Sequence, residues 1–299
     1  MRVLLLHNPT AGDEEHSRDT LVSALEAAGH GVVWQSTKES DWERALLDGA
    51  ELVVAAGGDG TVRKVFRQLA GTDVPATILP VGTANNIARS LGFAADEPLS
   101  NVHGWSRGRM VAYDIATLTS SRGEAPFVES AGAGLFADAL ARAENEEQEA
   151  SDKIEKGLRT LLKSLAECRP LPWTLELDGD RLADELVGIE VMNVSEAGPR
   201  IPLAPKADPC DGALDVVPIR SGDADHLRAY AEVRLAGASP EPPTFEVRRA
   251  VEIAFELPPG CPVHVDDELP ADGGAAAGRE VISARPAAQV QVLLPGTTH

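Results

Sequence analysis

The chain has 299 residues, of which 43% are hydrophobic and 25% charged, so it is long enough for about two folded domains and is neither disordered nor fibrous. Its 47 acidic and 27 basic residues leave a net charge of −20, and this negative surface makes nucleic acid a poor candidate partner. The longest apolar runs, of four to five residues, exclude a membrane-spanning helix, which needs roughly 20.

Up to about residue 108, short strand-like runs alternate with helical patterns. The predicted strands are 2–7, 31–36, 52–56 and 76–79, and the predicted helices begin near residues 14, 41 and 61. This alternation is typical of a parallel sheet with helices on its faces. It predicts an α/β domain over residues 1–110.

Three of these strands end in turns rich in glycine and polar residues, at 8–12, 57–61 and 80–86. Because the carboxyl ends of the strands in an open α/β sheet form the ligand crevice, we expect the three turns to converge on one site. The candidate binding residues in them are Asn8, Pro9, Gly12, Gly57, Gly58, Gly60, Thr61, Gly82, Thr83, Asn85 and Asn86.

The turn Gly57-Gly58-Asp59-Gly60-Thr61 carries the strongest signal. It follows an apolar strand and opens a helix, so backbone N–H groups and the positive end of a helix dipole would meet at one spot, as in a phosphate site. Asp59 there can hold a divalent cation or orient a hydroxyl. A plain turn with a helix cap is the alternative, but it does not explain three glycines.

Two other glycine patterns bear on function. The sequence contains no G-x-x-x-x-G-K-[ST] run, which makes a Walker-type ATPase a poor candidate. Gly132 to Ala137 matches G-x-G-x-x-A, yet it lies outside any βαβ pattern, so we interpret it as a structural glycine turn.

After Arg109 the sequence changes to short alternating segments separated by Pro, Gly and Asp turns, which predicts an antiparallel β domain over 111–287. A single helical stretch is predicted at about 152–168. Periodicity does not assign the closing strand, 290–294, so residues 288–299 are an optional part of the first domain. The predicted strands of the second domain are 114–118, 173–177, 186–193, 214–219, 250–257 and 263–265.

The turns at 57–61 and 80–86, preceded by the one at 8–12, resemble the catalytic domain of the diacylglycerol kinase family, most closely the soluble bacterial lipid kinases. Residues 203–215 resemble a motif in the second domain of that family, and residues 263–268 resemble its Asp-Gly-Glu segment. The resemblance implies a Rossmann-like nucleotide domain similar to that of 6-phosphofructokinases, a β-sandwich domain for the lipid substrate, and a cleft between them that binds ATP and Mg²⁺.

The resemblance also implies roles for single residues. Asp59 matches the aspartate near the phosphates and the metal, Asp114 matches an active-site aspartate, and Glu268 matches the general base. A structural Mg²⁺ site in the second domain is also implied. Its ligands would be the carboxylate of Asp211 and the backbone carbonyls of Asp208 and Ala213.

The implied activity is transfer of the γ-phosphate of ATP to the hydroxyl of a diacylglycerol-like lipid. An NAD kinase, which shares a Gly-Gly-Asp-Gly turn, is the nearest alternative, although residues 82–86 and 266–268 favour the lipid branch. A regulator that binds nucleotide or lipid without turnover is the other alternative. The departures from the family pattern that favour the regulator are Arg63, Lys64, Asn86 and Asp267.

The expected partner is a lipid presented at a membrane surface. Lys153, Lys156, Arg159 and Lys163 place positive charge on one side of the predicted helix, which either contacts an anionic membrane or is simply solvated. The apolar start of the chain breaks at Asn8-Pro9, too early for a signal peptide, and the three cysteines show no CxxC spacing. We therefore expect reduced thiols and a cytoplasmic protein, peripheral at the inner membrane face; a homodimer is left open.

Overall fold

The computed structural model describes residues 1–11, 16–145, 153–270 and 280–296. The chain forms two compact units: Met1–Ile115 with Ala288–His299, and Ala116–Ala287. The sequence predicted a division after residue 110. In the structure the first unit extends to Ile115 and includes the closing segment.

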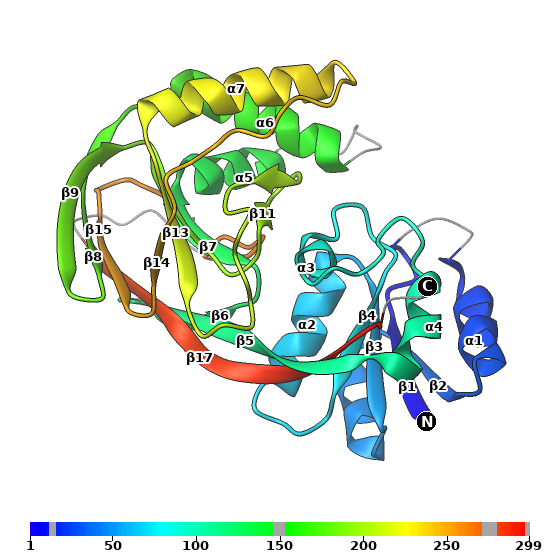
Figure 1. Cartoon of the computed structure of the whole chain (residues 1–299). Helices are drawn as coiled ribbons and strands as arrows, with labels where there is room; N and C mark the ends of the chain where they lie inside the picture. Colours follow the sequence, from blue (N-terminus) through cyan, green and yellow to red (C-terminus); the bar gives the residue numbers. More distant parts are fainter. Residues whose placement is uncertain (12–15, 146–152, 271–279, 297–299) are drawn as a thin grey trace. The chain divides into compact units, whose positions relative to one another are not determined.

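A parallel sheet with strand order β2-β1-β3-β4-β17 forms the centre of the first unit (Figure 1). Leu4 lies between Val33 and Val53 of the neighbouring strands, and Val292 is paired with Ala76. The first four strands closely match the predicted ranges. They are β1 (Arg2–His7), β2 (Gly31–Ser36), β3 (Leu52–Gly57) and β4 (Ala76–Pro80), and the fifth is the end of β17 (Glu280–Leu294).

Helices cover both faces of this sheet. One apolar cluster joins Val3 and Leu5 to α1 and to the segment around Trp105, while α2 packs against β3 and β4. Helix α1 begins later than predicted because the hydroxyl of Ser17 caps it by accepting the N–H of Thr20 (3.3 Å). The helices are α1 (Arg18–Ala27), α2 (Asp59–Leu69), α3 (Asn86–Ser90) and α4 (Ser100–Gly104), with 3₁₀ turns at Trp42–Asp48 and Trp105–Arg107.

The second unit contains two antiparallel sheets packed face to face, which confirms the predicted β-sandwich. The core between the sheets includes Phe127, Trp173 and Phe255 from one side and Ile189 and Val216 from the other. One sheet comprises β5 (Arg109–Ser120), β6 (Gly123–Phe127), β8 (Leu171–Leu177), β9 (Asp180–Leu186), β15 (Ile253–Leu257) and the start of β17. The other comprises β14 (Arg248–Ala250), β13 (Leu214–Ile219), β10 (Gly188–Met192), β7 (Ser130–Gly134) and β16 (Val263–Val265). A separate ribbon is formed by β11 (Glu196–Ala197) and β12 (Ile201–Pro202).

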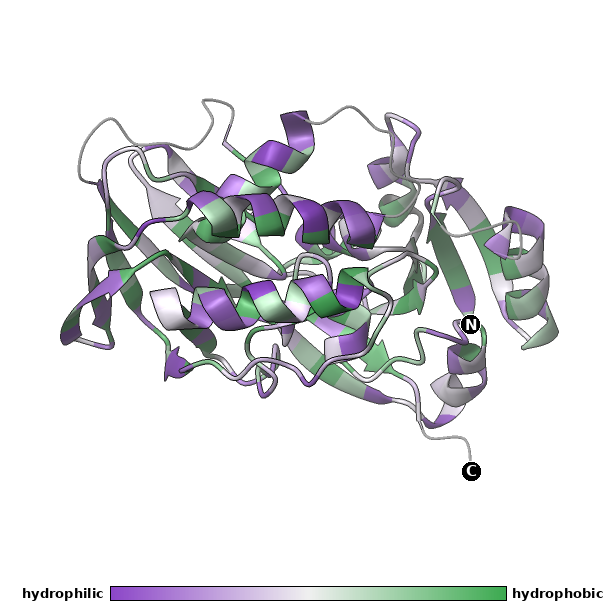
Figure 2. Ribbon diagram, turned by 90° about the horizontal axis from the view of Figure 1, so that it is seen from above, coloured by the Kyte–Doolittle hydropathy of each residue, from purple (hydrophilic) through white to green (hydrophobic). Residues whose placement is uncertain are grey.

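Three helices, α5 (Leu135–Asn145), α6 (Lys153–Glu167) and α7 (Ser221–Leu235), cover the outer face of the five-stranded sheet (Figure 1). The prediction of a single helical stretch was therefore wrong. Helices α6 and α7 lie side by side, and each carries both hydrophilic and hydrophobic residues along its length (Figure 2). Gly132 also differs from expectation, because it lies within strand β7 and not in a turn.

Strands β5 and β17 both run from one unit into the other. No helix in the described part of the chain is both long and apolar enough to cross a membrane. Cys168, Cys210 and Cys261, all within that part, form no disulfide.

Candidate functional site

The turns after β1, β3 and β4 lie at the carboxyl ends of the strands in the parallel sheet of the first unit. The strands that precede them are adjacent and point the same way, and the N–H of Asn8 donates to the carbonyl of Ala56 (3.0 Å) at the end of β3. The structure thus brings together the three turns that the sequence singled out. Gly12, a predicted member, lies outside the described residues.

Backbone contact between Gly58 and Gly82 joins the second turn to the third. A Cβ atom added to Gly82 would lie 2.7 Å from the backbone nitrogen of Gly58, and one added to Gly57 would lie 2.9 Å from Cγ2 of Thr61. No side chain fits at these two positions. The glycines therefore let two strand ends approach backbone to backbone, forming what we call the glycine cradle, residues 57–61 and 80–86.

Asn85 shapes the second half of the glycine cradle from inside. Its backbone is left-handed, with φ of 56°, a conformation that asparagine tolerates better than most residues. Its side-chain amide donates to the carbonyls of Pro80 (3.1 Å) and Gly82 (2.8 Å), and its Oδ1 accepts the N–H of Gly82 (3.1 Å). The described contacts of this predicted ligand-binding side chain thus hold the turn itself.

Asp59 ties the two turns together a second time. Its Oδ1 accepts the N–H of Ile87 (3.0 Å) in the first turn of α3. Burial raises the pKa of this carboxyl, while hydrogen bonds from backbone amides and the charge of Arg63 oppose that rise. Asp59 therefore caps the N-terminus of α3, and this hydrogen bond fixes its side chain within the glycine cradle.

Arg63 and Lys64, the two cations that depart from the family pattern, lie in different surroundings. Arg63 is buried, with 6% of its surface exposed, and its Nη2 lies 3.4 Å from where a Cβ of Gly60 would be. Lys64 is exposed. The N-terminus of α2, capped by Gly58, contributes a partial positive charge at the same place. A helix N-terminus and the guanidinium of Arg63 therefore lie beside the glycine cradle, where the charge of Arg63 also acts on the buried carboxylate of Asp59.

His7, the last residue of β1, lies at the same end of the sheet and was missed by the sequence analysis. It is 2% exposed, and its Nδ1 accepts a long hydrogen bond from Trp34 Nε1 (3.5 Å). Burial lowers its pKa, which favours the neutral ring. Among the described residues its Nε2 has no partner, which suits a bound polar group, since buried polar atoms are nearly always hydrogen-bonded. A polar residue closing an apolar strand just before Asn8-Pro9 was the available signal.

Asp114 lies on β5 and is buried. Its Oδ1 accepts a hydrogen bond from Nε2 of Gln289 (2.8 Å) on β17. The preceding residue, Tyr113, packs the edge of its ring on Phe66 of α2, with ring centres 5.1 Å apart. Gln289 thus holds the carboxylate of Asp114, while its neighbour Tyr113 joins β5 to α2, the helix that begins in the glycine cradle.

Glu268 belongs to the second unit, where it closes a tight turn. The N–H groups of Val265 and Glu268 each donate to the carbonyl of the other residue (3.0 and 3.1 Å), and Glu268 and Asp267 are exposed. The left-handed residue of the turn is Asp266, with φ of 54°. Asp59 and Asp114 lie in the first unit, so the meeting of all three carboxylates at one site stays a prediction.

Among the residues implied for a structural Mg²⁺, Asp211 has another partner at each of its carboxylate oxygens. Asp211 Oδ1 accepts the N–H of Ala213 (3.0 Å), and its Oδ2 pairs with Arg249 Nη2 (2.6 Å). The side chain of Asp208, whose carbonyl is the implied ligand, accepts the N–H of Cys210 at Oδ1 (3.0 Å). The Asp211 carboxylate therefore does not fit a metal ion unless Arg249 is displaced, and this site stays a prediction.

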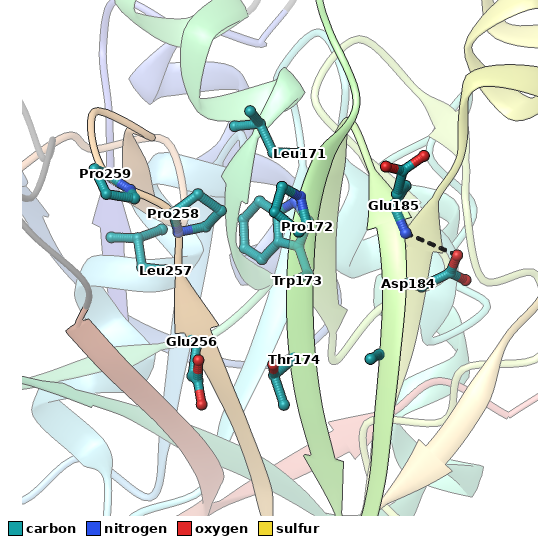
Figure 3. A pocket seen from close by; sticks show the side chains of 11 residues that line it. Leu171, Pro172, Trp173, Thr174, Asp184, Glu185, Glu256, Leu257, Pro258 and Pro259 are labelled. Carbon is teal, nitrogen blue, oxygen red and sulfur yellow. Dashed lines mark hydrogen bonds between the residues drawn. The ribbon is translucent and has the colours of Figure 1, made fainter.

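A pocket of about 560 Å³ lies over β8, β9 and β15 in the second unit (Figure 3). Leu171, Pro172 and Leu257 give it apolar walls, and Glu185 and Glu256 add acidic groups. None of the predicted site residues lines it. This pocket is therefore distinct from the candidate site.

Two family models account for most of the chain. Residues 2–118 match the model described as the diacylglycerol kinase catalytic domain, and residues 130–293 match the YegS C-terminal NAD kinase beta sandwich-like domain. A diacylglycerol kinase of Mycobacterium tuberculosis strain H37Rv is 29% identical over 260 residues, which cover 84% of this chain and 79% of that protein. A probable lipid kinase YegS-like of Pseudomonas fluorescens is 31% identical over 227 residues, covering 72% and 71%.

Solved structures show the same fold. The crystal structure of a diacylglycerol kinase from Bacillus anthracis superposes with a TM-score of 0.67 at 20% identity, covering 98% of this chain and 96% of that one. Yeast NADH kinase complexed with NADH superposes with a TM-score of 0.51 at 12% identity, covering 100% and 84%. At these identities the likeness shows the fold alone, and it confirms an α/β unit followed by a β-sandwich.

Proposed function

The chain belongs to the lipid kinases that join a diacylglycerol kinase catalytic domain to a YegS-type C-terminal domain, and we propose that it transfers the γ-phosphate of ATP to the hydroxyl of a diacylglycerol-like lipid. Membership confirms the resemblance seen in the turns of the first unit. The enzyme class is therefore that of a lipid kinase, while the nucleotide, the metal and the acceptor belong to the proposal.

The observation that carries the proposal is the glycine cradle. Phosphoryl transfer needs little covalent help from a protein, so catalysis is mostly alignment of the phosphates and neutralisation of their charge. Gly58 and Gly82 meet without side chains at the point where the two turns touch. The N-terminus of α2 and Arg63 supply positive charge there. This combination suits a polyphosphate better than a neutral ligand.

The carboxylates receive distinct roles in the proposed reaction. Glu268 accepts the proton of the lipid hydroxyl. At the same time the hydroxyl oxygen of the lipid bonds to the γ-phosphorus, and the bond from that phosphorus to the oxygen of ADP breaks. Mg²⁺, when bound with ATP, supplies positive charge to the phosphates, and Asp59 is the carboxylate of the glycine cradle that would hold it. Asp114, anchored by Gln289, is the third proposed active-site carboxylate.

The proposal is tested by offering γ-labelled ATP to the purified protein with diacylglycerol in mixed micelles, with NAD, or with no acceptor. Label in phosphatidic acid on a thin-layer plate supports the lipid kinase. Label in NADP alone would replace it with a nicotinamide-nucleotide kinase. ATP binding without transfer to any lipid of a panel would indicate a regulator without turnover.

Glu268→Gln is expected to lower kcat about 10²- to 10⁴-fold, the usual contribution of a general base, because the amide cannot accept the proton. ATP affinity, measured by titration calorimetry, should stay within about twofold, since the change leaves the phosphate turn intact. Asp267→Asn, a change to the neighbouring exposed carboxylate, is the matched control and should keep most of the activity. Unchanged turnover in Glu268→Gln would refute the assigned role.

A further inference from the structure

Three buried polar side chains lie behind the turn that carries Glu268. Glu190 is 0% exposed, His264 5% and Asp266 7%. None of them was assigned a function by the sequence analysis. They come from strand β10, strand β16 and the residue after β16, and all belong to the second unit.

The register of the five-stranded sheet places His264 and Glu190 in one row, with Gly132 of β7 between them. Gly132 is paired with His264 on one side and with Glu190 on the other. Because Gly132 has no side chain, the two residues meet above it, with His264 Nε2 3.1 and 3.0 Å from the Glu190 oxygens. A Cβ on Gly132 would lie 2.6 Å from Cδ of Glu190, so the pair needs the glycine.

The other ring nitrogen of His264 is bonded to the turn. Its Nδ1 lies 2.8 Å from the carbonyl oxygen of Asp266. A carbonyl oxygen can only accept a hydrogen bond, so Nδ1 donates to Asp266, and Nε2 faces the two oxygens of the Glu190 carboxylate, which form an ion pair with the ring when it is protonated. Burial lowers the pKa of His264, but the charge and hydrogen bond of Glu190 outweigh it and the pKa is raised overall.

Asp266 fixes the opposite side of the same turn. Its Oδ1 accepts the N–H groups of Val128 (3.1 Å), Glu129 (2.7 Å) and Ser130 (3.3 Å). Its own N–H donates to the carbonyl of Ser130 (2.7 Å). Asp266, in the buried half of the turn, is therefore held at its carbonyl, its N–H and its carboxylate. Glu268 lies in the exposed half.

We propose that His264, braced by Glu190, is a positioning residue that sets the turn Val265–Glu268 and with it the direction of the catalytic carboxylate. The inference rests on the proposed role of Glu268 as the base. Burying an ion pair costs more than burying apolar residues of the same volume, so stability alone is a poor reason to keep one. In this structure the ion pair holds His264 so that its Nδ1 donates to the carbonyl of Asp266.

Two double variants separate positioning from charge. Glu190→Gln with His264→Asn removes both charges and keeps an amide donor near the place of ring Nδ1, within reach of the Asp266 carbonyl. Glu190→Gln with His264→Gln also removes both charges, but puts the amide near the place of Nε2, away from the turn. The two proteins have the same net charge and differ by one methylene group.

The double variant that contains His264→Asn is expected to keep kcat within about threefold of wild type. The double variant that contains His264→Gln should lose about 10- to 100-fold in kcat, as expected for a displaced catalytic group, with KM for ATP unchanged. Equal kcat values in the two folded variants would overturn the proposal. So would a loss expressed in KM for ATP alone.

A measurement without substrate keeps this inference separate from the proposed reaction. Amide hydrogen exchange at Val265 and Glu268 should be faster in the His264→Gln double variant than in the His264→Asn one, whether or not any lipid is phosphorylated. Equal exchange would overturn the positioning role, while inactivity of the wild-type protein on every lipid would overturn only the proposed function. If a variant does not fold, nitrogen NMR of the wild-type ring decides: both ring nitrogens of His264 should carry protons, and an unprotonated Nδ1 would refute the proposal.

Discussion

At the scale of single residues, two glycines have different structural roles. Gly82 lets two backbones touch in the glycine cradle, and Gly132 lets two charged side chains meet above a strand. Neither position has a positive φ, so both are required by the space around them and not by the conformation of the chain. Substitution at either should therefore act through the missing room for a methyl group.

Gly82→Ala should weaken ATP binding at least about tenfold, because the added Cβ lies 2.7 Å from the Gly58 nitrogen and pushes the two turns apart. Titration calorimetry with ATP measures the effect. Gly222→Ala is the control, since a Cβ at Gly222 meets no atom within 4 Å. Equal ATP affinity in Gly82→Ala and wild type would show that the contact does not shape the site.

The sequence pointed to the residues of the glycine cradle but not to those that support them. Glycines and asparagines directly after apolar strands form a local signal, which is why the turns could be found. His264 and Glu190 are 74 positions apart, and only the strand register brings them together. A register of this kind depends on long-range pairing, which local patterns do not encode.

At the scale of elements, some strands were predicted with accurate bounds, while strands β6, β7 and β9 and helices α5 and α7 were missed. Strands β1, β2, β13 and β16 were predicted with their observed bounds, since short apolar runs between turn residues are distinctive. Helix α7 was missed because its buried side is narrow, formed by Ala224, Leu227 and Ala231, so it shows little apolar periodicity. Helix α5 was missed because it begins at Leu135, within the segment Gly132 to Ala137 that was interpreted as a glycine turn.

The loop before β13 and strand β14 provide an element-scale prediction about the metal. Arg249 already neutralises Asp211, so Mg²⁺ or its removal by EDTA should leave the thermal unfolding temperature of the wild-type protein unchanged. Arg249→Ala should cost about 1 kcal/mol or less, because the pair is partly exposed, and should make the unfolding temperature rise with Mg²⁺.

Arg248→Ala is the matched control for this measurement, since Arg248 pairs with Glu246 (2.6 Å) and not with Asp211. Its unfolding temperature should not respond to Mg²⁺. A wild-type protein that Mg²⁺ stabilises as much as it stabilises the Arg249→Ala variant would show that Arg249 does not exclude the metal, and would restore the structural metal site implied by the family.

At the scale of the whole molecule, the net charge of −20 opposes an anionic membrane, yet α6 presents a local basic face. Lys153, Arg159 and Lys163 are exposed on it, although Arg159 is paired with Glu155 (2.6 Å). Screening over about 8 Å at physiological salt lets such a patch act independently of distant charge. We propose that this face contacts the membrane that presents the lipid.

Reversing Lys153, Arg159 and Lys163 to glutamate should weaken binding to phosphatidylglycerol vesicles, by about 1 kcal/mol for each residue near the surface. Co-sedimentation at low and physiological salt measures it. A variant with Arg44, Arg109 and Arg181 reversed has the same net charge and should bind as the wild type does. Equal binding by both variants would mean that the face of α6 is merely solvated.

The closing strand could not be assigned from periodicity, and its placement has a consequence for how the protein is made. Val292, which pairs with β4, is synthesised after every residue of the second unit. On the ribosome the β-sandwich is thus nearly complete while the nucleotide unit still lacks one strand of its sheet. A nascent chain that stops early carries β4 with a bare edge, so the half that we propose binds ATP is the last to be finished.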